Sequence, residues 1–337
     1  MSMADRDGWI WMDGEFVPWR DAKIHVLTHT LHYGMGVFEG VRAYKTASGP
    51  AIFRLKEHTQ RLFNSAKIFQ MRVPFDPTTL EQAQRDVVKR NQLESCYIRP
   101  IIWIGSEKLG IAARDNKIHV SVSAWPWGAY LGEDGLTKGI RVKTSSFTRH
   151  HVNVSLVRAK ASGYYINSIL ANQEVGAHGY DEALLLDTDG YVSEGSGENV
   201  FIVRNGKLYT PDLASCLDGI TRDAVITMAR DMGIETIEKR ITRDEMYCAD
   251  EGFSPGRPPK SHRFANSTIA PSAMAHAARS PKNCRACSLT WWRANLPNTA
   301  IGCIRCKPPA LVNATPREHP CPTHRPPLPP TATPRCF

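Results

Sequence analysis

Proline is unevenly distributed along this chain of 337 residues, and its distribution limits where a folded core can form. Sixteen of the 23 prolines lie after residue 251. Proline lacks a backbone N–H, so it interrupts both helices and interior strands. The same segment carries 12 Lys and Arg against one acidic residue, whereas residues 1–251 carry 30 Lys and Arg against 32 Asp and Glu. We therefore expect a folded core within residues 1–251 and a basic, largely disordered tail at residues 252–337.

The chain is long enough for two domains with separate cores. It contains no run of about 18 apolar residues, and its first residues lack the charged-then-apolar pattern of a signal peptide. These observations predict a soluble, cytoplasmic protein without a membrane partner. The formal charge of +9 comes entirely from the tail, so it does not predict a nucleic-acid-binding surface on the core.

Residues 155–201 contain a lysine and a glutamate whose surroundings indicate joint chemistry. Lys160 precedes three small residues, Ala161, Ser162 and Gly163, so a bulky planar group can approach its amine. Glu194 follows a strand-like run at residues 182–187 and a turn. A lysine that forms an imine and a carboxylate that pairs with a pyridinium nitrogen are what pyridoxal phosphate (PLP) requires. Taken singly, either residue would be interpreted as a solvated charge.

Residue spacing predicts a mixture of helices and strands, an α/β (α+β) fold. Alternation around Asp13-Gly14 and around Asn205-Gly206 predicts two β-hairpins. We expect helices at residues 55–70, 79–91, 165–175 and 221–232, and strands at residues 96–104, 139–147, 199–204 and 207–210. A Pro/Gly-containing connection at residues 126–136 is the expected boundary between a small domain, residues 1–125, and a larger one, residues 137–251.

The motifs resemble those of the fold-type IV PLP enzymes, the class IV aminotransferases. Residues 158–160 match the family's Arg-Ala-Lys segment, and residues 193–199 match its Ser-Glu-Gly-x-Gly-Glu-Asn segment. Within that family the chain is similar to branched-chain amino-acid aminotransferases over residues 9–251. The resemblance implies a two-domain fold-type IV enzyme whose larger domain binds PLP, and a homodimer or higher homo-oligomer.

The resemblance also implies the residues that hold the cofactor. Lys160 would be the catalytic lysine, Glu194 the partner of the pyridine nitrogen and Tyr165 the partner of the phenolic oxygen. Arg61 would hold the phosphate, a task that suits the fork of a guanidinium. Leu217, Ile220 and Thr221 would seat the phosphate at a helix start, where free N–H groups and the helix dipole attract anions. A simple Thr221 N-cap is the alternative interpretation of that helix start.

The substrate residues implied by the resemblance lie in the small domain and the connection: Tyr33, Phe38, Tyr97, Arg99, Trp127 and Tyr130. Tyr97 and Arg99 stand two residues apart on a strand and so share one face. Arg99 is the candidate partner for the distal carboxylate of glutamate or 2-oxoglutarate. The implied reaction is transamination between branched-chain L-amino acids (leucine, isoleucine, valine) and 2-oxoglutarate, as in amino-acid biosynthesis.

Other functions compete with this hypothesis. A D-amino-acid aminotransferase or an aminodeoxychorismate lyase would share the fold, although the YIRP run at residues 97–100 and AWPWGAYLG at residues 124–132 argue against both. A zinc- or nucleic-acid-binding protein is indicated by two CxxC pairs in the tail, Cys284/Cys287 and Cys303/Cys306. His150 and His151 are adjacent, so on an extended chain they point apart, and we expect no metal site there.

The tail departs from the family at residue 252, where a Thr-Gly-Thr-Ala-Ala-Glu run is expected. A lost base in codon 252 explains the departure. In the shifted frame the codons from Phe253 onward can spell Phe-Leu-Thr-Gly-Thr-Ala-Ala-Glu, which restores the missing run. We therefore expect residues 252–337 to be out-of-frame translation, their CxxC pairs to follow from base composition, and the activity of this chain to be impaired.

Overall fold

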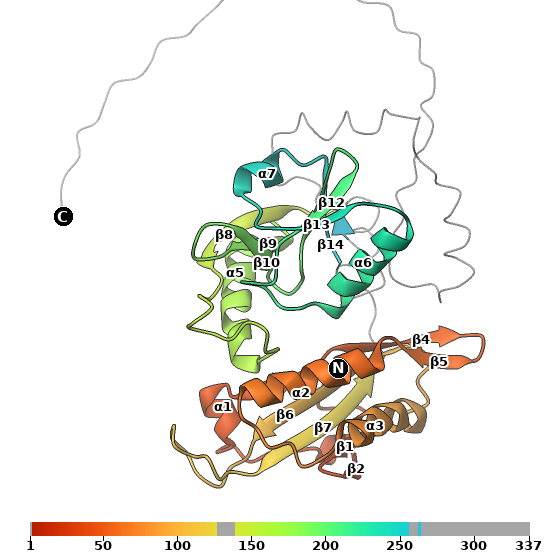
Figure 1. The fold of residues 1–337 in the computed structure, drawn as a ribbon. Helices are drawn as coiled ribbons and strands as arrows, with labels where there is room; N and C mark the ends of the chain where they lie inside the picture. The colour runs from red at the N-terminus through yellow and green to blue at the C-terminus, as the bar shows by residue number, and fades with distance from the viewer. Residues whose placement is uncertain (1, 127–138, 256–261, 264–337) are drawn as a thin grey trace, which may run out of the picture. The chain divides into compact units, whose positions relative to one another are not determined.

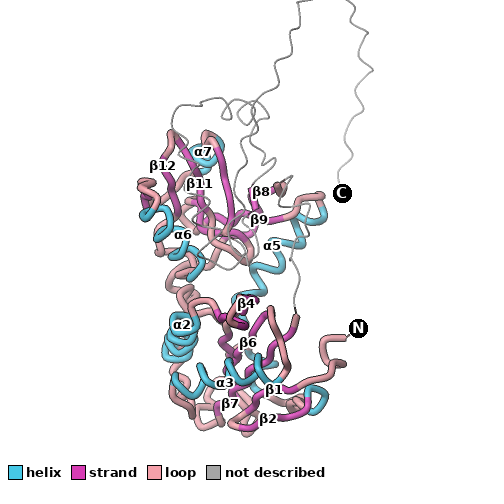
Figure 2. Tube along the Cα trace, turned by 90° about the vertical axis from the view of Figure 1, so that its right-hand side faces the viewer, coloured by secondary structure: helices cyan, strands magenta, loops and turns pink. Residues whose placement is uncertain are grey.

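The computed structural model describes residues 2–126, 139–255 and 262–263 of the chain. The described residues form three β-sheets with helices packed against them (Figure 1). In these ranges no helix is both long and apolar enough to cross a membrane. Both helices and strands occur in the N-terminal and C-terminal parts (Figure 2), as the spacing of apolar residues predicts.

The N-terminal part, residues 2–126, is built on a seven-stranded sheet. Its strand order is β2-β1-β7-β6-β4-β5, with β3 paired to β6, and all of its pairings are antiparallel. The strands are β1 (Trp9–Met12), β2 (Glu15–Pro18), β3 (Gly36–Phe38), β4 (Val41–Thr46), β5 (Gly49–Ile52), β6 (Cys96–Ile104) and β7 (Ile118–Trp125). The short helices η1 (Trp19–Asp21) and α1 (His29–Tyr33) precede β3.

Two helices, α2 (Leu55–Ile68) and α3 (Pro77–Arg90), contact each other and pack on this sheet (Figure 1). Helix α3 begins two residues earlier than the sequence predicts, because Asp76 accepts a hydrogen bond from the Thr79 N–H at 2.9 Å and Pro77 occupies the first helical position. Leu62 of α2 and Leu80 of α3 are both fully buried. They join sheet residues in one hydrophobic core.

The C-terminal part, residues 139–263, begins with a three-stranded sheet of order β10-β9-β8. Its elements are β8 (Val142–Thr148), η2 (Ser162–Tyr164), α5 (Tyr165–Ala177), β9 (Glu182–Leu186) and β10 (Val192–Gly195). Strands β8 and β9 are parallel and α5 connects them, while β10 returns antiparallel to β9. Parallel neighbours need such a crossover, and α5 supplies it while packing on both strands.

A five-stranded sheet of order β13-β12-β11-β14-β15 completes the described fold. Its strands are β11 (Phe201–Arg204), β12 (Lys207–Thr210), β13 (Thr236–Glu238), β14 (Glu251–Ser254) and β15 (His262–Arg263). Helix α6 (Ile220–Asp231) connects the parallel strands β12 and β13. Helix α7 (Arg243–Tyr247) begins with a capping box formed by Thr242 and Glu245.

The predicted strands at residues 96–104 and 207–210 have the observed bounds, and both predicted hairpins form around their turns. The strand expected at residues 139–147 is shifted and runs from Val142 to Thr148. The change in composition at residue 252 falls inside β14, which pairs with β11 from Glu251 to Phe253. Most of the expected connection at residues 126–136 and most of the expected tail at residues 252–337 lie outside the described residues.

The core of the N-terminal part provides a stability test. Leu80→Ala should lower the free energy of unfolding by about 2–5 kcal/mol, because it removes a fully buried side chain and leaves a cavity between α3 and the sheet. The matched control is Leu109→Ala, since Leu109 is 46 % exposed and its truncation should change stability by less than about 0.5 kcal/mol. Urea denaturation followed by circular dichroism measures both, and equal losses would contradict the assigned core.

Candidate active site

Lys160 lies at the point where the N-terminal and C-terminal parts exchange main-chain hydrogen bonds. Its N–H donates to Ser65 Oγ of α2 at 3.0 Å, and its carbonyl oxygen accepts from the Phe38 N–H of β3 at 3.0 Å. An isolated bridge pairs the neighbouring residues Val37 and Ala161. The main chain at Lys160 is therefore held from two elements that lie far away in sequence.

The lysine amine is buried among aromatic side chains. Lys160 is 7 % exposed, and its Nζ donates to the Tyr165 hydroxyl at 2.8 Å. The same nitrogen lies 5.5 Å from the ring centres of both Phe38 and Tyr165. Sequence analysis predicted that Lys160, Tyr165 and Phe38 share one site, and the structure brings these three side chains together.

The small residues after Lys160 allow this segment to lie close to the turn that follows α1. A Cβ atom on Gly163 would lie 3.2 Å from the carbonyl oxygen of Gly34, and the Gly163 N–H donates to that oxygen at 3.2 Å. Gly34 itself has a φ of +69°, a conformation that glycine adopts without strain. The glycines thus let the turn after α1 contact the segment that carries the lysine.

Glu194 of β10 is 5 % exposed and lies against a guanidinium and a backbone N–H. Arg149 Nε lies 2.9 Å from its Oε1, and the Leu217 N–H donates to its Oε2 at 3.2 Å. Because both charges of this pair are buried, the carboxylate is compensated by the guanidinium. Sequence analysis missed Arg149, whose position next to two histidines carries no signal of a partner in the Glu194 motif.

Arg61 is bound to a carboxylate that sequence analysis also missed. Glu39 is fully buried; its Oε1 accepts from Arg61 Nε at 2.6 Å and its Oε2 accepts from Arg61 Nη2 at 2.9 Å. His58 Nδ1 lies 2.8 Å from the same Oε2. Burial raises the pKa of Glu39, but the Arg61 charge and the His58 hydrogen bond outweigh it and hold that pKa well below its usual range. Burial lowers the pKa of His58.

A sequence signal for this cluster existed. Glu39 is an acidic residue inside an apolar, glycine-containing run, and His58 precedes Arg61 by three positions, which places both on one face of α2. A carboxylate in a buried run requires a cationic or hydrogen-bonding partner. The sequence does not say which cation that partner would be.

The turn before α6 meets Arg61. Arg61 Nη1 donates to the Asp218 carbonyl oxygen at 2.6 Å, and Asn199 Nδ2 donates to the Leu217 carbonyl oxygen at 3.0 Å. Gly219 is the N-cap residue of α6, so Ile220 and Thr221 occupy its first turn, and the interpretation of Thr221 as a simple N-cap is wrong. A Cβ atom on Gly219 would lie 1.9 Å from Asn199 Oδ1. Glycine at residue 219 therefore allows the turn to pack against Asn199.

Arg99 lies beside Phe38 and Tyr97. Its Nη2 donates to the Tyr97 hydroxyl at 2.9 Å, and its Cζ lies 4.4 Å from the centre of the Phe38 ring. Tyr97 is 1 % exposed, and a Cβ atom on Gly40 would lie 2.1 Å from its hydroxyl. Because Phe38 also contacts the Lys160 amine, a single aromatic ring connects the arginine to the lysine.

Tyr33, a predicted substrate residue, contacts a different part of the chain. It is 45 % exposed, and its hydroxyl accepts a hydrogen bond from the Gly110 N–H at 3.1 Å. Two further predicted substrate residues, Trp127 and Tyr130, lie outside the described residues. Within the described ranges no group of three or more His, Cys, Asp or Glu could hold a metal ion.

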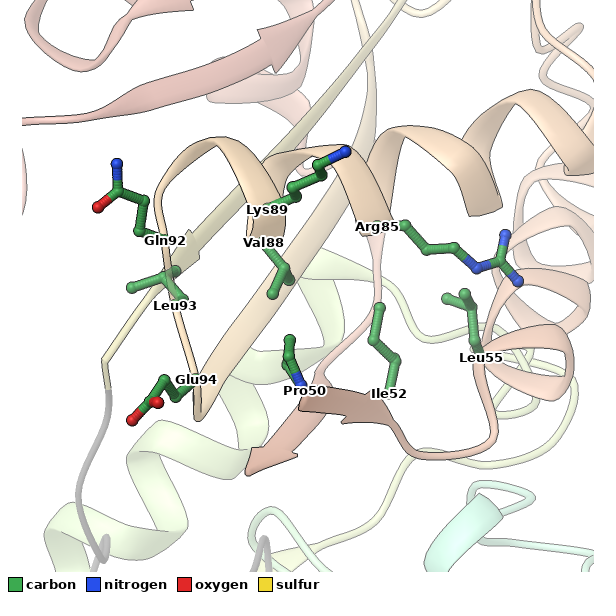
Figure 3. A pocket seen from close by; sticks show the side chains of 9 residues that line it. All are labelled: Pro50, Ile52, Leu55, Arg85, Val88, Lys89, Gln92, Leu93 and Glu94. Atoms are coloured by element: carbon green, nitrogen blue, oxygen red, sulfur yellow. The ribbon is translucent and has the colours of Figure 1, made fainter. Parts of the chain in front are cut away.

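A surface pocket of about 610 Å³ lies elsewhere, between β5 and the C-terminal half of α3 (Figure 3). Leu55, Val88 and Leu93 contribute to its lining, with Arg85 and Lys89 extending from α3. It includes none of the residues around Lys160. We therefore assign the candidate active site to the side chains around Lys160 and not to this pocket.

Comparison with known proteins identifies the family. A family profile described as "Amino-transferase class IV" matches residues 36–256. A branched-chain-amino-acid aminotransferase of Pseudomonas aeruginosa is 60 % identical over 256 residues, which is 76 % of this chain and 83 % of the relative. The enzyme of the same name from Escherichia coli K12 is 46 % identical over 250 residues, 74 % of this chain and 81 % of the relative.

Solved structures agree with these relatives. The T.th. branched-chain amino acid aminotransferase with pyridoxamine 5′-phosphate superposes with a TM-score of 0.76 at 52 % identity, over 78 % of this chain and 87 % of that one. The Escherichia coli enzyme superposes with a TM-score of 0.76 at 44 % identity, with the same coverage. The chain therefore belongs to the class IV aminotransferase family, in the group of branched-chain-amino-acid aminotransferases.

Proposed function

We propose that this chain is a PLP-dependent transaminase of branched-chain L-amino acids that uses 2-oxoglutarate as the second amino-group partner. The observation that carries the proposal is the Lys160 amine, which is buried and lies 2.8 Å from the Tyr165 hydroxyl. The T.th. relative was solved with pyridoxamine 5′-phosphate and with N-(5′-phosphopyridoxyl)-L-glutamate, which supports both the cofactor and a glutamate-type substrate.

The chemistry of the donor set fits PLP. Lys160 offers a primary amine for covalent attachment, Tyr165 a hydroxyl for the phenolic oxygen, and Glu194 a carboxylate for the pyridine nitrogen. Arg61 and the first turn of α6 offer N–H groups for the phosphate, with Leu217 forming the adjoining turn. When bound, PLP supplies an aldehyde for the covalent link and a ring that accepts electron density from the substrate's Cα.

Lys160 is the proton carrier in this proposal. Its amine would remove the proton from the substrate's Cα and hand it to the cofactor during the first half-reaction, and would move a proton in the opposite direction, onto the Cα of the second substrate, during the second. The aromatic rings of Phe38 and Tyr165 exclude water from the amine, and the main-chain bonds to Ser65 and Phe38 keep the lysine in place.

Glu194 has the role of keeping the pyridine nitrogen protonated, and Arg149 has the role of orienting Glu194. The Arg149 guanidinium lies 2.9 Å from one carboxylate oxygen, and the Leu217 N–H donates to the other at 3.2 Å. These two contacts fix the orientation of the carboxylate.

Arg99 has the role of binding the distal carboxylate of glutamate and 2-oxoglutarate, while Phe38 and Tyr97 provide apolar surface for leucine-like side chains. The arginine packs on the Phe38 ring, so a hydrocarbon chain and a carboxylate could be accommodated on one side of the lysine. We retain Tyr33, Trp127 and Tyr130 as proposed pocket residues from the family resemblance.

We also propose a homodimer or higher homo-oligomer. The described surface exposes large apolar residues in two regions, one before and within α1 and the other before and within α5. These residues are Val26, Leu27, Leu31, Val152, Val154, Leu156, Ile166, Ile169 and Leu170. Contiguous exposed apolar surface is typical of protein interfaces. Light scattering coupled to size-exclusion chromatography measures the assembly.

The activity of this chain is proposed to be impaired by the sequence from residue 252 onward. The family's Thr-Gly-Thr-Ala-Ala-Glu run would bring additional hydroxyl and N–H donors to the phosphate and the substrate carboxylate, and this chain has Pro255, Gly256 and Arg257 in that stretch instead. D-amino-acid transamination, lyase chemistry, and zinc or nucleic-acid binding by the tail remain the competing hypotheses, and the third experiment below separates zinc binding from transamination.

The first test locates the covalent link. With the reading frame restored, borohydride reduction in the presence of PLP should attach the cofactor to Lys160, because its amine is the buried one beside Tyr165. Peptide mapping by mass spectrometry locates the adduct. Lys160→Ala should abolish the labelling, and an adduct on another lysine would reject the assignment.

The second test concerns Arg99. In the restored frame, Arg99→Ala should weaken the use of 2-oxoglutarate by about thirtyfold relative to 4-methyl-2-oxopentanoate, because only the former has a distal carboxylate for a charge-assisted hydrogen bond. Steady-state kinetics with both oxo acids measures the ratio. The matched control is Arg141→Ala, which removes a guanidinium that lies over the Tyr180 ring, and it should leave the ratio unchanged. Equal losses for both oxo acids in Arg99→Ala would reject the role.

The third test compares the present chain with a version whose frame is restored from codon 252. The present chain should bind PLP weakly and transaminate leucine slowly or not at all, whereas the restored chain should do both, because it regains the anion-binding run. Cofactor absorbance, leucine transamination and bound zinc are measured on both proteins. Full activity of the present chain, or one tightly held zinc ion in its tail, would contradict the proposal.

A further inference from the structure

Glu39 has no role in the proposed reaction, yet among the described residues without such a role it is the most deeply buried charged side chain. Its side chain is 0 % exposed, and it lies directly after β3, where the Glu39 N–H donates to the Pro100 carbonyl oxygen at 2.9 Å. Arg61 binds both carboxylate oxygens and His58 binds one of them. Two side chains of α2 therefore bind the carboxylate, while β6 binds the main chain of the same residue.

Stability alone does not explain such a cluster. Removing two charges from water costs more than their attraction commonly returns, and replacing a buried ion pair by apolar residues is often neutral or stabilising. What the buried pair does provide is a fixed orientation, because the two parallel N–H···O contacts of a guanidinium and a carboxylate define one plane. The geometry points to Arg61 as the group whose orientation matters.

The contacts of Arg61 leave a defined part of the guanidinium available. A guanidinium has five N–H groups. Nε and one N–H of Nη2 donate to Glu39, and one N–H of Nη1 donates to the Asp218 carbonyl oxygen at 2.6 Å. Within the described residues, one N–H on Nη1 and one on Nη2 remain. Such a fork matches two oxygens of a phosphate.

The available N–H groups of Arg61 lie on a guanidinium that is also bound to the turn before α6, whose N-terminus can attract an anion. Asp218, whose carbonyl oxygen Arg61 binds, immediately precedes Gly219, the N-cap residue of α6. The N–H groups of the first turn of this twelve-residue helix have no partners within the helix. Glu39 thus determines how Arg61 is oriented relative to a helix N-terminus.

We propose that Glu39, supported by His58, is a positioning residue that orients Arg61 toward the phosphate of the cofactor, and that it thereby makes the site select PLP over pyridoxal. The inference rests on the proposed function, since the anion is taken to be the cofactor phosphate. It concerns Glu39 and His58, which contact Arg61 and not the reacting atoms.

Charge and orientation predict opposite outcomes when the carboxylate is removed. Glu39→Gln deletes a negative charge next to Arg61, so attraction for a phosphate dianion should rise if net charge controls affinity. If orientation controls affinity, the loss of the bidentate contact frees the guanidinium to rotate, and phosphate binding should weaken. The glutamine retains the size of the side chain, which separates these effects from a cavity.

The test is equilibrium binding of PLP and of pyridoxal, followed by absorbance, to the 337-residue chain and to its frame-restored version. Glu39→Gln should weaken PLP binding by about tenfold or more, the loss typical of one charge-assisted hydrogen bond, and should change pyridoxal binding by less than about twofold. His58→Gln should produce a smaller loss in the same direction. Glu39→Asp, which keeps the charge on a shorter side chain, should restore part of the PLP affinity.

A double-mutant cycle tests whether Glu39 acts through Arg61. Arg61→Lys should weaken PLP binding. The double variant Arg61→Lys/Glu39→Gln should bind PLP less than about twofold more weakly than Arg61→Lys alone, because the guanidinium that Glu39 orients is already absent. The matched control is Asp13→Asn, which removes the negative charge of a carboxylate that lies 2.6 Å from His119, in the turn between β1 and β2, and it should leave both affinities unchanged.

Each remaining outcome overturns a specific statement. Unchanged or stronger PLP binding by Glu39→Gln, or equal losses for PLP and pyridoxal, would overturn the positioning role while leaving the proposed function intact. Wild-type protein that binds neither compound at Lys160 in either version would overturn both. Thermal unfolding is measured for every variant. If Glu39→Gln does not fold, the test uses Glu39→Asp, and a ratio of PLP affinity to pyridoxal affinity equal to that of the wild type would overturn the role.

Discussion

The main-chain hydrogen bonds of Lys160 are the constraint on which the site depends. The peptide groups on either side of the lysine are bound to β3 and to α2, so the start of its side chain is held in one place. Phe38 then contributes twice, because its N–H donates to the Lys160 carbonyl oxygen and its ring lies near both the amine and Arg99. Backbone geometry thus organises both the lysine and the proposed substrate side.

Two carboxylates, Glu39 and Glu194, are both buried beside an arginine, but we propose different roles for the two ion pairs. Each is paired with an arginine, the partly buried Arg61 in one case and the buried Arg149 in the other. Each pair is completed by a further group, His58 beside Glu39 and the Leu217 N–H beside Glu194. In our proposal, Arg149 orients the Glu194 carboxylate, whereas the Glu39 carboxylate orients Arg61. The same ion-pair chemistry would then support both the nitrogen end and the phosphate end of the proposed cofactor site.

Local patterns predicted most of the secondary structure but only part of the site. Strand bounds such as Cys96–Ile104 follow from the apolar pattern, because that pattern is a property of the segment itself. Motif resemblance grouped Lys160 with Tyr165 and Phe38, and these three side chains do contact one another in the structure. Arg149 and Glu39 were missed because their importance depends on partners that are distant in sequence and become neighbours only after the sheets and helices pack. Trp127 and Tyr130 remain predictions.

Strand β14 spans the position at which we propose that the reading frame changes. The composition changes at residue 252, yet residues 251–253 continue the ladder with β11, and Phe253 stacks on Phe201 with ring centres 5.2 Å apart. Inter-strand pairing uses peptide N–H and C=O groups that every residue except proline carries. The main-chain pairing of β14 therefore tolerates most changes of side chain until the first proline, which here is Pro255. A chain with the proposed out-of-frame tail would keep the β11–β14 ladder while lacking the donors of the Thr-Gly-Thr-Ala-Ala-Glu run.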